Sequence, residues 1–473
     1  MAGLAAGLVG CGPSPAPVVV LVSWDTTRAD ALGCYADVSH WGLDLPESRR
    51  PVPHTPRVDA LAARGVRHQW ALAHAPTTLA SHASMMSGRD TRGARVPRNG
   101  FPVEPDIPLL APRFTSAGWD TVAVVGASVL AKDMGLARGF EVYDDRVRQK
   151  VRRRYERPAH KVVARALQIV DQRGVFDRNT PLFLFVHMFD AHSPWDTAPD
   201  TIRARFDDPS YQGSVDGSGD SVDWLVKSTR KGTVGSADRA RARALYLSEV
   251  SAMDDALGML LDGLGERFTM DDSLVVLVGD HGEALDQPSI RPYGHGLDVD
   301  LVATHVPFVV AGTGRFADGL TEGQVVAEPV GLMDLAPTLS AIAGLSPDPT
   351  AQGVDLRTVW SGSAEPRWVL SEATKPADVE QAPDWNNVRK ERAVVGQGLV
   401  VTHTPWADAT QGGTGPHVFA LAPGQPATAK APTATLQSML RALSTWDDEA
   451  PAFRDPHMTD ETKEALRALG YLD

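Results

Sequence analysis

Short apolar runs rich in β-branched residues recur along the chain, at residues 18–22, 121–125, 182–186, 274–278 and 306–310. Unbroken apolar runs of this length predict strands that are buried on both faces of a sheet. The last of these runs is entered through Pro307. The pattern therefore predicts at least five strands, most of them in the interior of a sheet.

Helical patterns lie between these runs. In the clearest, residues 244–264, apolar residues recur at the spacing of one helix face: Ala252, Met253, Ala256, Leu257, Leu260, Leu261 and Leu264. Strands that alternate with helices predict an α/β fold with a large, doubly wound, mostly parallel sheet. Residues 204–238 are polar and rich in Gly, Ser and Asp, which fits a lid over one edge of that sheet and a plain surface loop equally well.

The pattern changes beyond residue 345. Two apolar runs flank a Gly-Gln-Gly turn and predict a hairpin, a third run predicts another strand, and two segments have helical patterns: residues 392–395, 399–402, 418–421, 435–443 and 460–469. We expect a smaller α+β subdomain over residues 346–473. The main domain would then span residues 17–345, after a short signal and tether over residues 1–16.

Composition narrows the class of protein. The chain has 473 residues, of which 43% are hydrophobic and 22% charged, as is ordinary for a globular protein with a large core. Its formal net charge is −13, and no basic patch is interleaved with aromatic residues. Nucleic acid is therefore not an expected partner.

Only Cys11 and Cys34 occur, so the sequence predicts no disulfide framework. Cys11 instead bears on the cellular location of the protein. Residues 8–11, Leu-Val-Gly-Cys, resemble the lipobox that directs lipid attachment to Cys in bacterial lipoproteins, and a proline-rich tether follows. We expect an exported lipoprotein held at the cell envelope only through a lipid on Cys11, or otherwise a periplasmic protein. No Lys or Arg precedes the short apolar stretch, so a misplaced start codon and a chance match are the alternatives.

Candidate metal-binding residues, Asp and His, follow three of the predicted strands. Residues 18–22 lead to Asp25, residues 182–186 lead to His187-Met-Phe-Asp-Ala-His192, and residues 274–278 lead to Asp280-His281. The carboxyl ends of parallel strands meet at one edge of a sheet, which is where such folds bind ligands. A single Asp–His pair on a turn is often incidental, but three such ends together predict a convergent metal site.

The pattern of a fourth segment, residues 76–89, predicts a turn followed by a short helix that ends at a glycine. We expect Thr78 at the N-cap and His82 on the same helix face, four residues later. The unpaired N–H groups and the positive end of the helix dipole would favour an anion beside Thr78. A threonine N-cap without a catalytic role is the alternative, since Thr is common at that position.

Six segments together resemble the sulfatase-like branch of the alkaline phosphatase superfamily, in order and approximate spacing: WDTTRADALGCY, PTTLASHASMMSGR, FDAHSPW, GDHGE, YGHG and VPFVVAG. Weaker matches are MDLAPTLSAIAGL at residues 333–345 and LRALGYL at residues 466–472, close to the C-terminus. The resemblance covers roughly residues 18–473. It implies a large α/β sheet with a small C-terminal subdomain, in agreement with the pattern above.

The resemblance also implies residue roles. Asp25, Asp280 and His281 would hold a divalent cation, with the Thr78 oxygen as the fourth protein ligand. His192 and His295 match positions that contact the substrate oxyanion or its leaving group, or that bind a second metal together with Asp190. His82 occupies the place of the arginine that supports the nucleophile. One or two ions are therefore expected, and carboxylate-rich ligands with one His permit Zn, Mn, Mg or Ca.

Three departures from the family pattern carry information. Sulfatases have Cys or Ser in a C/S-x-P-x-R motif and oxidise it to formylglycine, whereas this chain has Thr78-x-Ala80-x-His82. The second Asp of the family's Asp-Asp pair is Thr26, and the Arg that precedes Val-Pro is His305. All three changes resemble the threonine-nucleophile members, which include phosphodiesterases and phosphoethanolamine or glycerophosphate transferases.

The nucleophile decides the predicted chemistry. A formylglycine hydrate has two hydroxyls, of which one attacks sulfur and the other later expels sulfate. Thr78 has one hydroxyl, which suits metal-assisted attack on phosphorus. We therefore expect an anionic ester as substrate, a phosphorylated Thr78 intermediate, and catalytic residues Thr78, His82, His192 and His295. A sulfuric-ester hydrolase and an inactive binding lipoprotein are the alternatives.

Overall fold

The computed structural model describes residues 16–38, 50–147, 156–175, 178–287, 292–374, 390–404, 416–422 and 428–452, with residues 459–460, 463–464 and 467 near the C-terminus. Cys11 and the predicted signal and tether lie outside these residues, apart from Ala16. Most of the helix predicted at residues 460–469 also lies outside them.

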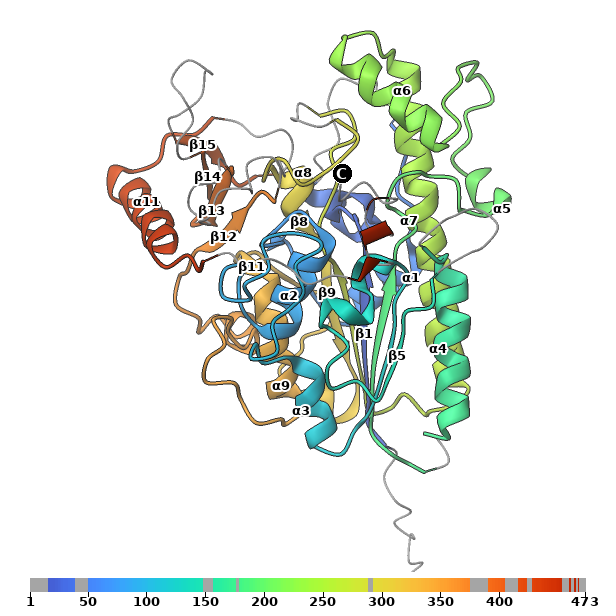
Figure 1. Cartoon of the computed structure of the whole chain (residues 1–473), viewed down its shortest axis with the longest axis vertical. Coiled ribbons are helices and arrows are strands. Elements are labelled where there is room, and N and C mark those ends of the chain that lie inside the picture. The colour runs from blue at the N-terminus through green and yellow to red at the C-terminus, as the bar shows by residue number, and fades with distance from the viewer. Residues whose placement is uncertain are drawn as a thin grey trace, which may run out of the picture.

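An eight-stranded sheet forms the centre of the molecule, in the order β10-β2-β9-β7-β1-β6-β4-β5 (Figure 1). Its strands are β1 Val18–Trp24, β2 Val66–His68, β4 Asp120–Val124, β5 Val142–Asp144, β6 Leu182–Met188, β7 Ser273–Gly279, β9 Phe308–Gly312 and β10 Gln324–Val326. Only the pairs of β9 with β7 and with β2 are antiparallel. The predicted large, mostly parallel sheet is therefore confirmed.

Both faces of this sheet are covered, as the double winding predicts. Along β1, Val20 and Val22 enter one core and Val19 and Leu21 enter the other. This alternation follows from the two-residue period of a strand. Figure 1 shows α4 and α7 on one side of the sheet and α2, α3 and α9 on the other. The helices are α1 Pro56–Ala63, α2 Thr78–Ser87, α3 Leu110–Ser116, α4 Ala159–Arg173, α5 Asp200–Arg203, α6 Gly219–Arg230, α7 Ser236–Gly265, α8 Leu301–Thr304, α9 Leu335–Ile342, α10 Arg357–Trp360 and α11 Thr433–Asp448.

Two predicted elements need correction. The strand predicted at residues 306–310 is two strands, because Pro307 interrupts it. The first, β8 (His305–Val306), joins β3 (Ala71–Leu72) and β11 (Val330–Gly331) in a small separate sheet, and β9 follows in the main sheet. The helix predicted at 244–264 is α7, which begins eight residues earlier and takes in the end of the polar segment 204–238. That segment also contains α6, and its role as a lid stays a prediction.

A second, smaller sheet lies in the C-terminal part of the chain, as the hairpin pattern predicts. Its four strands are antiparallel, in the order β12 Val369–Glu372, β13 Arg392–Gly396, β14 Leu399–His403 and β15 His417–Ala420. Met439, Leu443 and Trp446 of α11 pack against Val394 and Val401 of this sheet. The predicted domain boundaries at residues 16 and 345 stay predictions.

The smaller sheet is joined to the segment that leads into α2. The His74 ring Nδ1 lies 2.7 Å from the Leu370 carbonyl oxygen, and Ser371 Oγ donates to the Ala73 carbonyl oxygen over 2.7 Å. The Glu372 N–H donates to the His74 carbonyl oxygen over 3.0 Å. Because Thr78 follows only four residues after His74, these bonds help to fix the start of α2.

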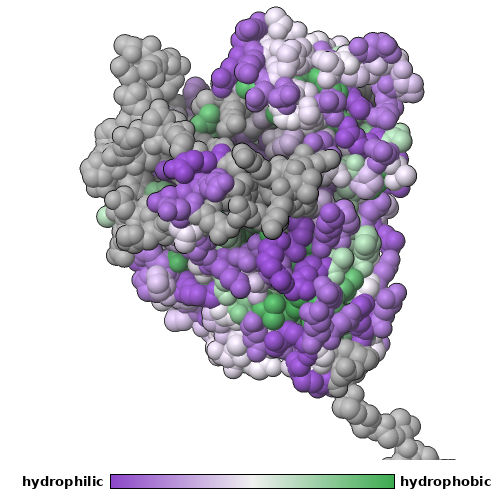
Figure 2. Space-filling model, turned by 45° about the vertical axis from the view of Figure 1, so that its right-hand side comes forward, coloured by the Kyte–Doolittle hydropathy of each residue, from purple (hydrophilic) through white to green (hydrophobic). Residues whose placement is uncertain are grey.

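The surface shown in Figure 2 is mostly hydrophilic over the described residues, with hydrophobic residues gathered in a small area low on that face. Large hydrophobic side chains that are exposed in the described part of the chain are few: Val52, Trp224, Met259 and Val325. Of the helices that the structure describes, none combines the length and the apolar character that crossing a membrane requires.

Candidate active site

The ends of three neighbouring strands lie level with one another. Trp24 of β1 is in register with Met188 of β6 and with Gly279 of β7. The Asp25 N–H donates to the Met188 carbonyl oxygen over 2.9 Å, and the Asp280 N–H donates to the Trp24 carbonyl oxygen over 3.2 Å. The sheet register therefore brings Asp25 and Asp280 together at its carboxyl edge, as the three strand ends predicted.

Asp25, Asp280 and His281 form a cluster of potential metal ligands. One ligand atom from each lies within 4.8 Å of the other two, and all three side chains are fully buried. Asp25 Oδ1 and Asp280 Oδ2 are buried without a hydrogen-bond partner. A buried carboxylate oxygen that accepts no hydrogen bond is costly unless a cation balances it. These residues therefore fit the divalent cation that the carboxylate-rich pattern predicted.

The ring of His281 presents a lone pair to this cluster. Its Nδ1 lies 2.9 Å from the Gly282 carbonyl oxygen, which can only accept, so Nδ1 carries the hydrogen. Nε2 is then the acceptor nitrogen, 3.6 Å from Asp280 Oδ2 and 3.5 Å from Thr78 Oγ1. Burial lowers the pKa of His281 to about 4, which keeps the ring in the neutral form that binds metals.

The pKa values of the two carboxyl groups shift in opposite directions. Burial, and next the charge of Asp25, raise the pKa of Asp280 well above its usual range. Burial also acts to raise the pKa of Asp25, but the hydrogen bond from His187 and the nearby imidazoles of His281 and His192 outweigh it and lower that pKa. Without a cation, Asp280 therefore tends to keep a proton beside an ionised Asp25. A bound cation would replace that proton.

Thr78 stands at the start of α2, facing this cluster. The N-cap is Thr77, with φ −150° and ψ 146°, and Thr78 is already the first helical residue. The predicted N-cap was therefore wrong by one residue. This shift leaves the Thr78 hydroxyl free of a capping role, and its Oγ1 lies 3.5 Å from His281 Nε2. Asn99 Oδ1 accepts the next helical N–H, that of Leu79, over 2.7 Å.

His82 is placed behind the nucleophile rather than at the solvent side of the site. Its Nδ1 lies 2.7 Å from the Thr78 carbonyl oxygen and its Nε2 lies 2.8 Å from Ser23 Oγ, so the ring ties α2 to β1. Burial lowers the pKa of His82 to about 3, so the ring is neutral at neutral pH. These contacts agree with the expected support of the nucleophile, and a catalytic role of His82 stays a prediction.

His192 and His295 face each other on the more accessible side of the site. They are 9% and 8% exposed, whereas the cation cluster is fully buried. The Nδ1 atoms lie 2.8 Å from the Ser193 carbonyl oxygen and 3.0 Å from the Pro76 carbonyl oxygen, so both carry hydrogen. The two Nε2 atoms are 3.4 Å apart, a distance at which one proton can be shared between them. The pair is thus suited to give a proton to an oxygen that departs from the substrate.

The predicted second metal site of Asp190, His192 and His295 is not assembled. Among the described residues, their ligand atoms do not form a group within 4.8 Å of one another. Both carboxylate oxygens of Asp190 instead accept the Ala159 N–H at the start of α4, over 3.0 and 2.9 Å. A carboxylate is favoured at a helix N-terminus, where it satisfies an unpaired N–H. Burial raises the pKa of this carboxyl to about 6.

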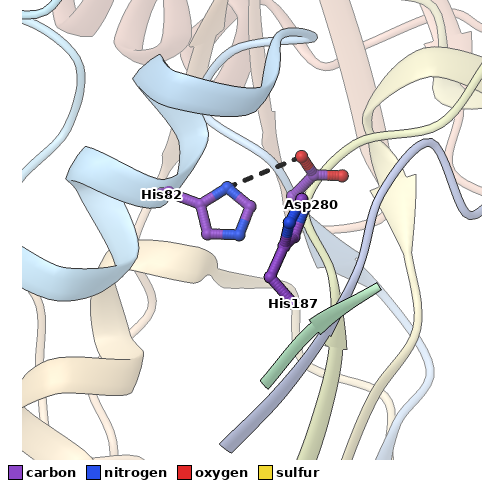
Figure 3. A group of neighbouring side chains, drawn as sticks. All are labelled: His82, His187 and Asp280. Carbon is purple, nitrogen blue, oxygen red and sulfur yellow. Dashed lines mark ion pairs between the residues drawn. The ribbon is translucent and has the colours of Figure 1, made fainter. Parts of the chain in front are cut away.

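The sequence reading overlooked His187 as a functional residue. Figure 3 shows His187 with His82 and Asp280, a group whose ligand atoms also lie within 4.8 Å of one another. His187 is fully buried and in register with Ser23 at the end of β1. Its Nε2 lies 3.3 Å from Asp25 Oδ2. An imidazole directly after an apolar run was the signal that could have found it, since such a side chain must find a polar partner.

Comparison with known proteins identifies relatives over most of the chain. The family model described as Sulfatase matches residues 17–345. The choline-sulfatase of Rhizobium meliloti (strain 1021) is 30% identical over 146 residues, which are 30% of this chain and 26% of that protein. The arylsulfatase of Clostridium perfringens (strain 13 / Type A) is 25% identical, over 42% of this chain and 41% of that protein. The chain thus aligns with less than half the length of these two relatives.

Solved structures share the fold at low identity. The phosphonate monoester hydrolase of Agrobacterium radiobacter has a TM-score of 0.64 and 18% identity, covering 92% of this chain and 95% of that one. The structure of BT4656 in complex with its substrate D-glucosamine-2-N,6-O-disulfate has a TM-score of 0.62 and 14% identity, covering 92% and 98%. These likenesses confirm the fold, a large mostly parallel sheet with a smaller antiparallel sheet.

Proposed function

Because the chain belongs to the sulfatase family of hydrolases, we propose that it cleaves or transfers phosphate esters, with a divalent cation and a covalent intermediate on Thr78. The observation that carries the proposal is the Thr78 hydroxyl, 3.5 Å from His281 Nε2 beside two buried carboxyl groups. No cysteine stands at this position, since the chain contains only Cys11 and Cys34.

Asp25, Asp280 and His281 would hold the cation, with Thr78 Oγ1 as the fourth protein ligand. Bound there, a divalent cation supplies positive charge that lowers the hydroxyl pKa and offsets charge on the transferred group. His82 and Ser81 support this arrangement from α2, because Ser81 Oγ donates to the Asp280 carbonyl oxygen over 2.6 Å. The nucleophile and its cation ligands are thus anchored to one another through backbone atoms.

In the proposed reaction, Thr78 Oγ, its hydroxyl proton released to solvent, forms a bond to phosphorus while the bond from phosphorus to the ester oxygen breaks. The His192–His295 pair gives the departing oxygen its proton. The oxygen of a water molecule, or of an acceptor alcohol in a transferase, then attacks the phosphorus and gives its proton to the pair. The bond from phosphorus to Thr78 Oγ breaks, which regenerates the deprotonated Thr78 oxygen. General acid catalysis of this kind typically contributes about a hundred- to ten-thousand-fold.

Phosphorus is favoured over sulfur because Thr78 has a single hydroxyl. A sulfated threonine has no second hydroxyl with which to expel sulfate, so release requires attack of water at the sulfur. Metal-assisted displacement at phosphorus needs no such second group. The chemistry of the side chain therefore supports a phosphate ester as the substrate.

A sulfuric-ester hydrolase is the second candidate, because the relatives named above are a choline-sulfatase and an arylsulfatase. Turnover of p-nitrophenyl sulfate, bis-p-nitrophenyl phosphate and p-nitrophenyl phosphate by metal-loaded protein separates the two. Thr78→Ser and Thr78→Ala serve as matched variants, because only the former keeps a hydroxyl. We expect phosphate ester turnover by wild type and Thr78→Ser. Faster turnover of the sulfate would contradict the proposal, and no turnover of any ester would favour an inactive binding protein.

A further inference from the structure

We propose that His187 is the positioning residue of the cation site. We propose also that the uncharged rings of His187 and His82 hold the site in place through hydrogen bonds and do not bind a second cation. This inference rests on the proposed role of Asp25 as a cation ligand. It concerns how the protein holds that ligand, which none of the matched motifs addresses.

The hydrogen position on His187 follows from its two neighbours. The Gly126 N–H donates to His187 Nδ1 over 3.3 Å. A backbone N–H cannot accept, so Nδ1 bears the lone pair and Nε2 bears the hydrogen. Nε2 therefore donates to Asp25 Oδ2, at 3.3 Å. Asp25 Oδ1, which is buried without a hydrogen-bond partner, is left as the oxygen available to a cation.

These bonds form a chain across three adjacent strands. Gly126 lies just beyond β4, His187 is in β6, and Asp25 follows β1. The close approach at Gly126 depends on its lack of a side chain. A Cβ there would lie 2.9 Å from the His187 carbonyl oxygen and 3.4 Å from the Phe189 Cβ. The backbone that follows β4 is thus able to fix the ring of His187, and the ring fixes the Asp25 carboxylate.

The hydrogen positions on the two rings also disfavour a cation between His82, His187 and Asp280, although their ligand atoms lie close together. A nitrogen ligand needs a lone pair, and the lone pair of His187 is taken by Gly126. His82 Nδ1 faces the Thr78 carbonyl oxygen over 2.7 Å and so carries hydrogen, while its lone pair on Nε2 faces Ser23 Oγ. The nitrogen of His82 that lies 3.6 Å from Asp280 Oδ2 is therefore the protonated one (Figure 3).

The test compares His187→Leu, which removes the donor, with His187→Gln, which can keep one. His68→Leu is the control, because His68 is also fully buried and hydrogen-bonded, to Trp360 Nε1 over 3.1 Å. Calorimetric titration of metal-free protein with Mn²⁺ gives affinity and stoichiometry, and thermal unfolding without metal measures the structural cost. Neither readout depends on turnover.

We expect wild-type protein to bind one Mn²⁺ and His187→Leu to bind one Mn²⁺ about 10- to 100-fold more weakly, the usual effect of losing a group that orients a ligand. His187→Gln should recover most of the affinity. His68→Leu should keep wild-type affinity even if it unfolds at a lower temperature. If His187→Leu fails to fold, Gly126→Ala carries the test, with weaker Mn²⁺ binding expected.

Unchanged affinity in His187→Leu, or in Gly126→Ala when it replaces that variant, would overturn the positioning role. Two ions per wild-type chain, with one lost in His187→Leu, would overturn it in favour of a second cation site. A failure of the proposed function is distinguishable, because it would show as absent phosphate ester turnover by wild-type protein that binds Mn²⁺ normally.

Discussion

Replacing Asp280 by Asn tests the electrostatics of the cation site. The nearest ligand oxygens of Asp25 and Asp280 lie within 4.8 Å of each other in a fully buried site. At an effective dielectric constant of about 20, two unit charges at that distance repel by about 3 kcal/mol. Asp280 avoids this repulsion by keeping its proton, since burial and the charge of Asp25 raise its pKa well above the usual value of a carboxyl group. Asp280→Asn imitates the protonated form at every pH.

The sign of the pH dependence follows from that raised pKa. A carboxyl group whose folded pKa exceeds its unfolded value stabilises the fold at low pH, and this contribution is lost as the pH rises through the folded pKa. Metal-free wild-type protein should therefore lose stability toward alkaline pH. Metal-free Asp280→Asn carries no proton to release, so it should exceed metal-free wild-type protein at pH 5 and by a larger margin at pH 7 and 9. Once Asp280 is ionised, the charge repulsion alone accounts for about 3 kcal/mol of that margin.

Urea unfolding at pH 5, 7 and 9, with and without Mn²⁺, provides the assay. Mn²⁺ should stabilise wild-type protein by about 2.7 kcal/mol at a hundredfold excess over its dissociation constant, and should stabilise Asp280→Asn far less. Asp254→Asn is the control, because Asp254 is another buried carboxyl group, with its pKa raised to about 7, that accepts N–H groups of α1. Equal stabilisation of wild type and Asp280→Asn by Mn²⁺ would refute the assignment of Asp280 as a ligand.

Two further outcomes follow from the site, and a third follows from the sequence around Cys11. Burial lowers the pKa of His82 to about 3, so the contribution of the neutral ring to stability is present above pH 6.5 and is lost below it, by about 1.4 kcal/mol per pH unit. In urea unfolding, His82→Gln should therefore lose less stability per pH unit than wild-type protein, and an equal slope would contradict this. Asp190→Asn should destabilise the protein by about 1 kcal/mol without changing Mn²⁺ affinity, whereas weaker binding in a titration would make Asp190 a ligand. The lipobox-like segment gives a separate expectation: wild-type protein in the membrane fraction of expressing bacteria and Cys11→Ser in the soluble fraction. An equal distribution of the two would exclude the lipid anchor.

Sequence patterns found the parts of the site that depend on strand order and register. Asp25 and Asp280 each follow a buried strand, and the strand ends of a parallel sheet meet wherever the exact boundaries fall. His281 needed only its adjacency to Asp280. These residues could be predicted because one backbone geometry places all of them at the same edge.

Features that depend on side-chain direction could not be predicted in this way. Asp190 follows a buried strand as Asp25 does, yet its carboxylate turns to the start of α4, because that helix offers an N–H. His187 precedes Asp190 by three residues and turns toward Asp25, because the Gly126 N–H fixes its ring. A strand pattern predicts which residues lie at the end of a strand. Which of their side chains point into the site depends on the hydrogen-bond partners that the neighbouring elements provide.

Direct detection of the covalent intermediate tests the central claim most sharply. Metal-loaded protein is mixed with bis-p-nitrophenyl phosphate, quenched in cold acid within the first turnover, digested and analysed by mass spectrometry. We expect a phosphate-derived adduct on Thr78 in wild-type protein and none in Thr78→Ala, which should lose turnover. Undiminished phosphate ester cleavage by Thr78→Ala, or a sulfated Thr78 that forms and decays during rapid turnover of p-nitrophenyl sulfate, would contradict it.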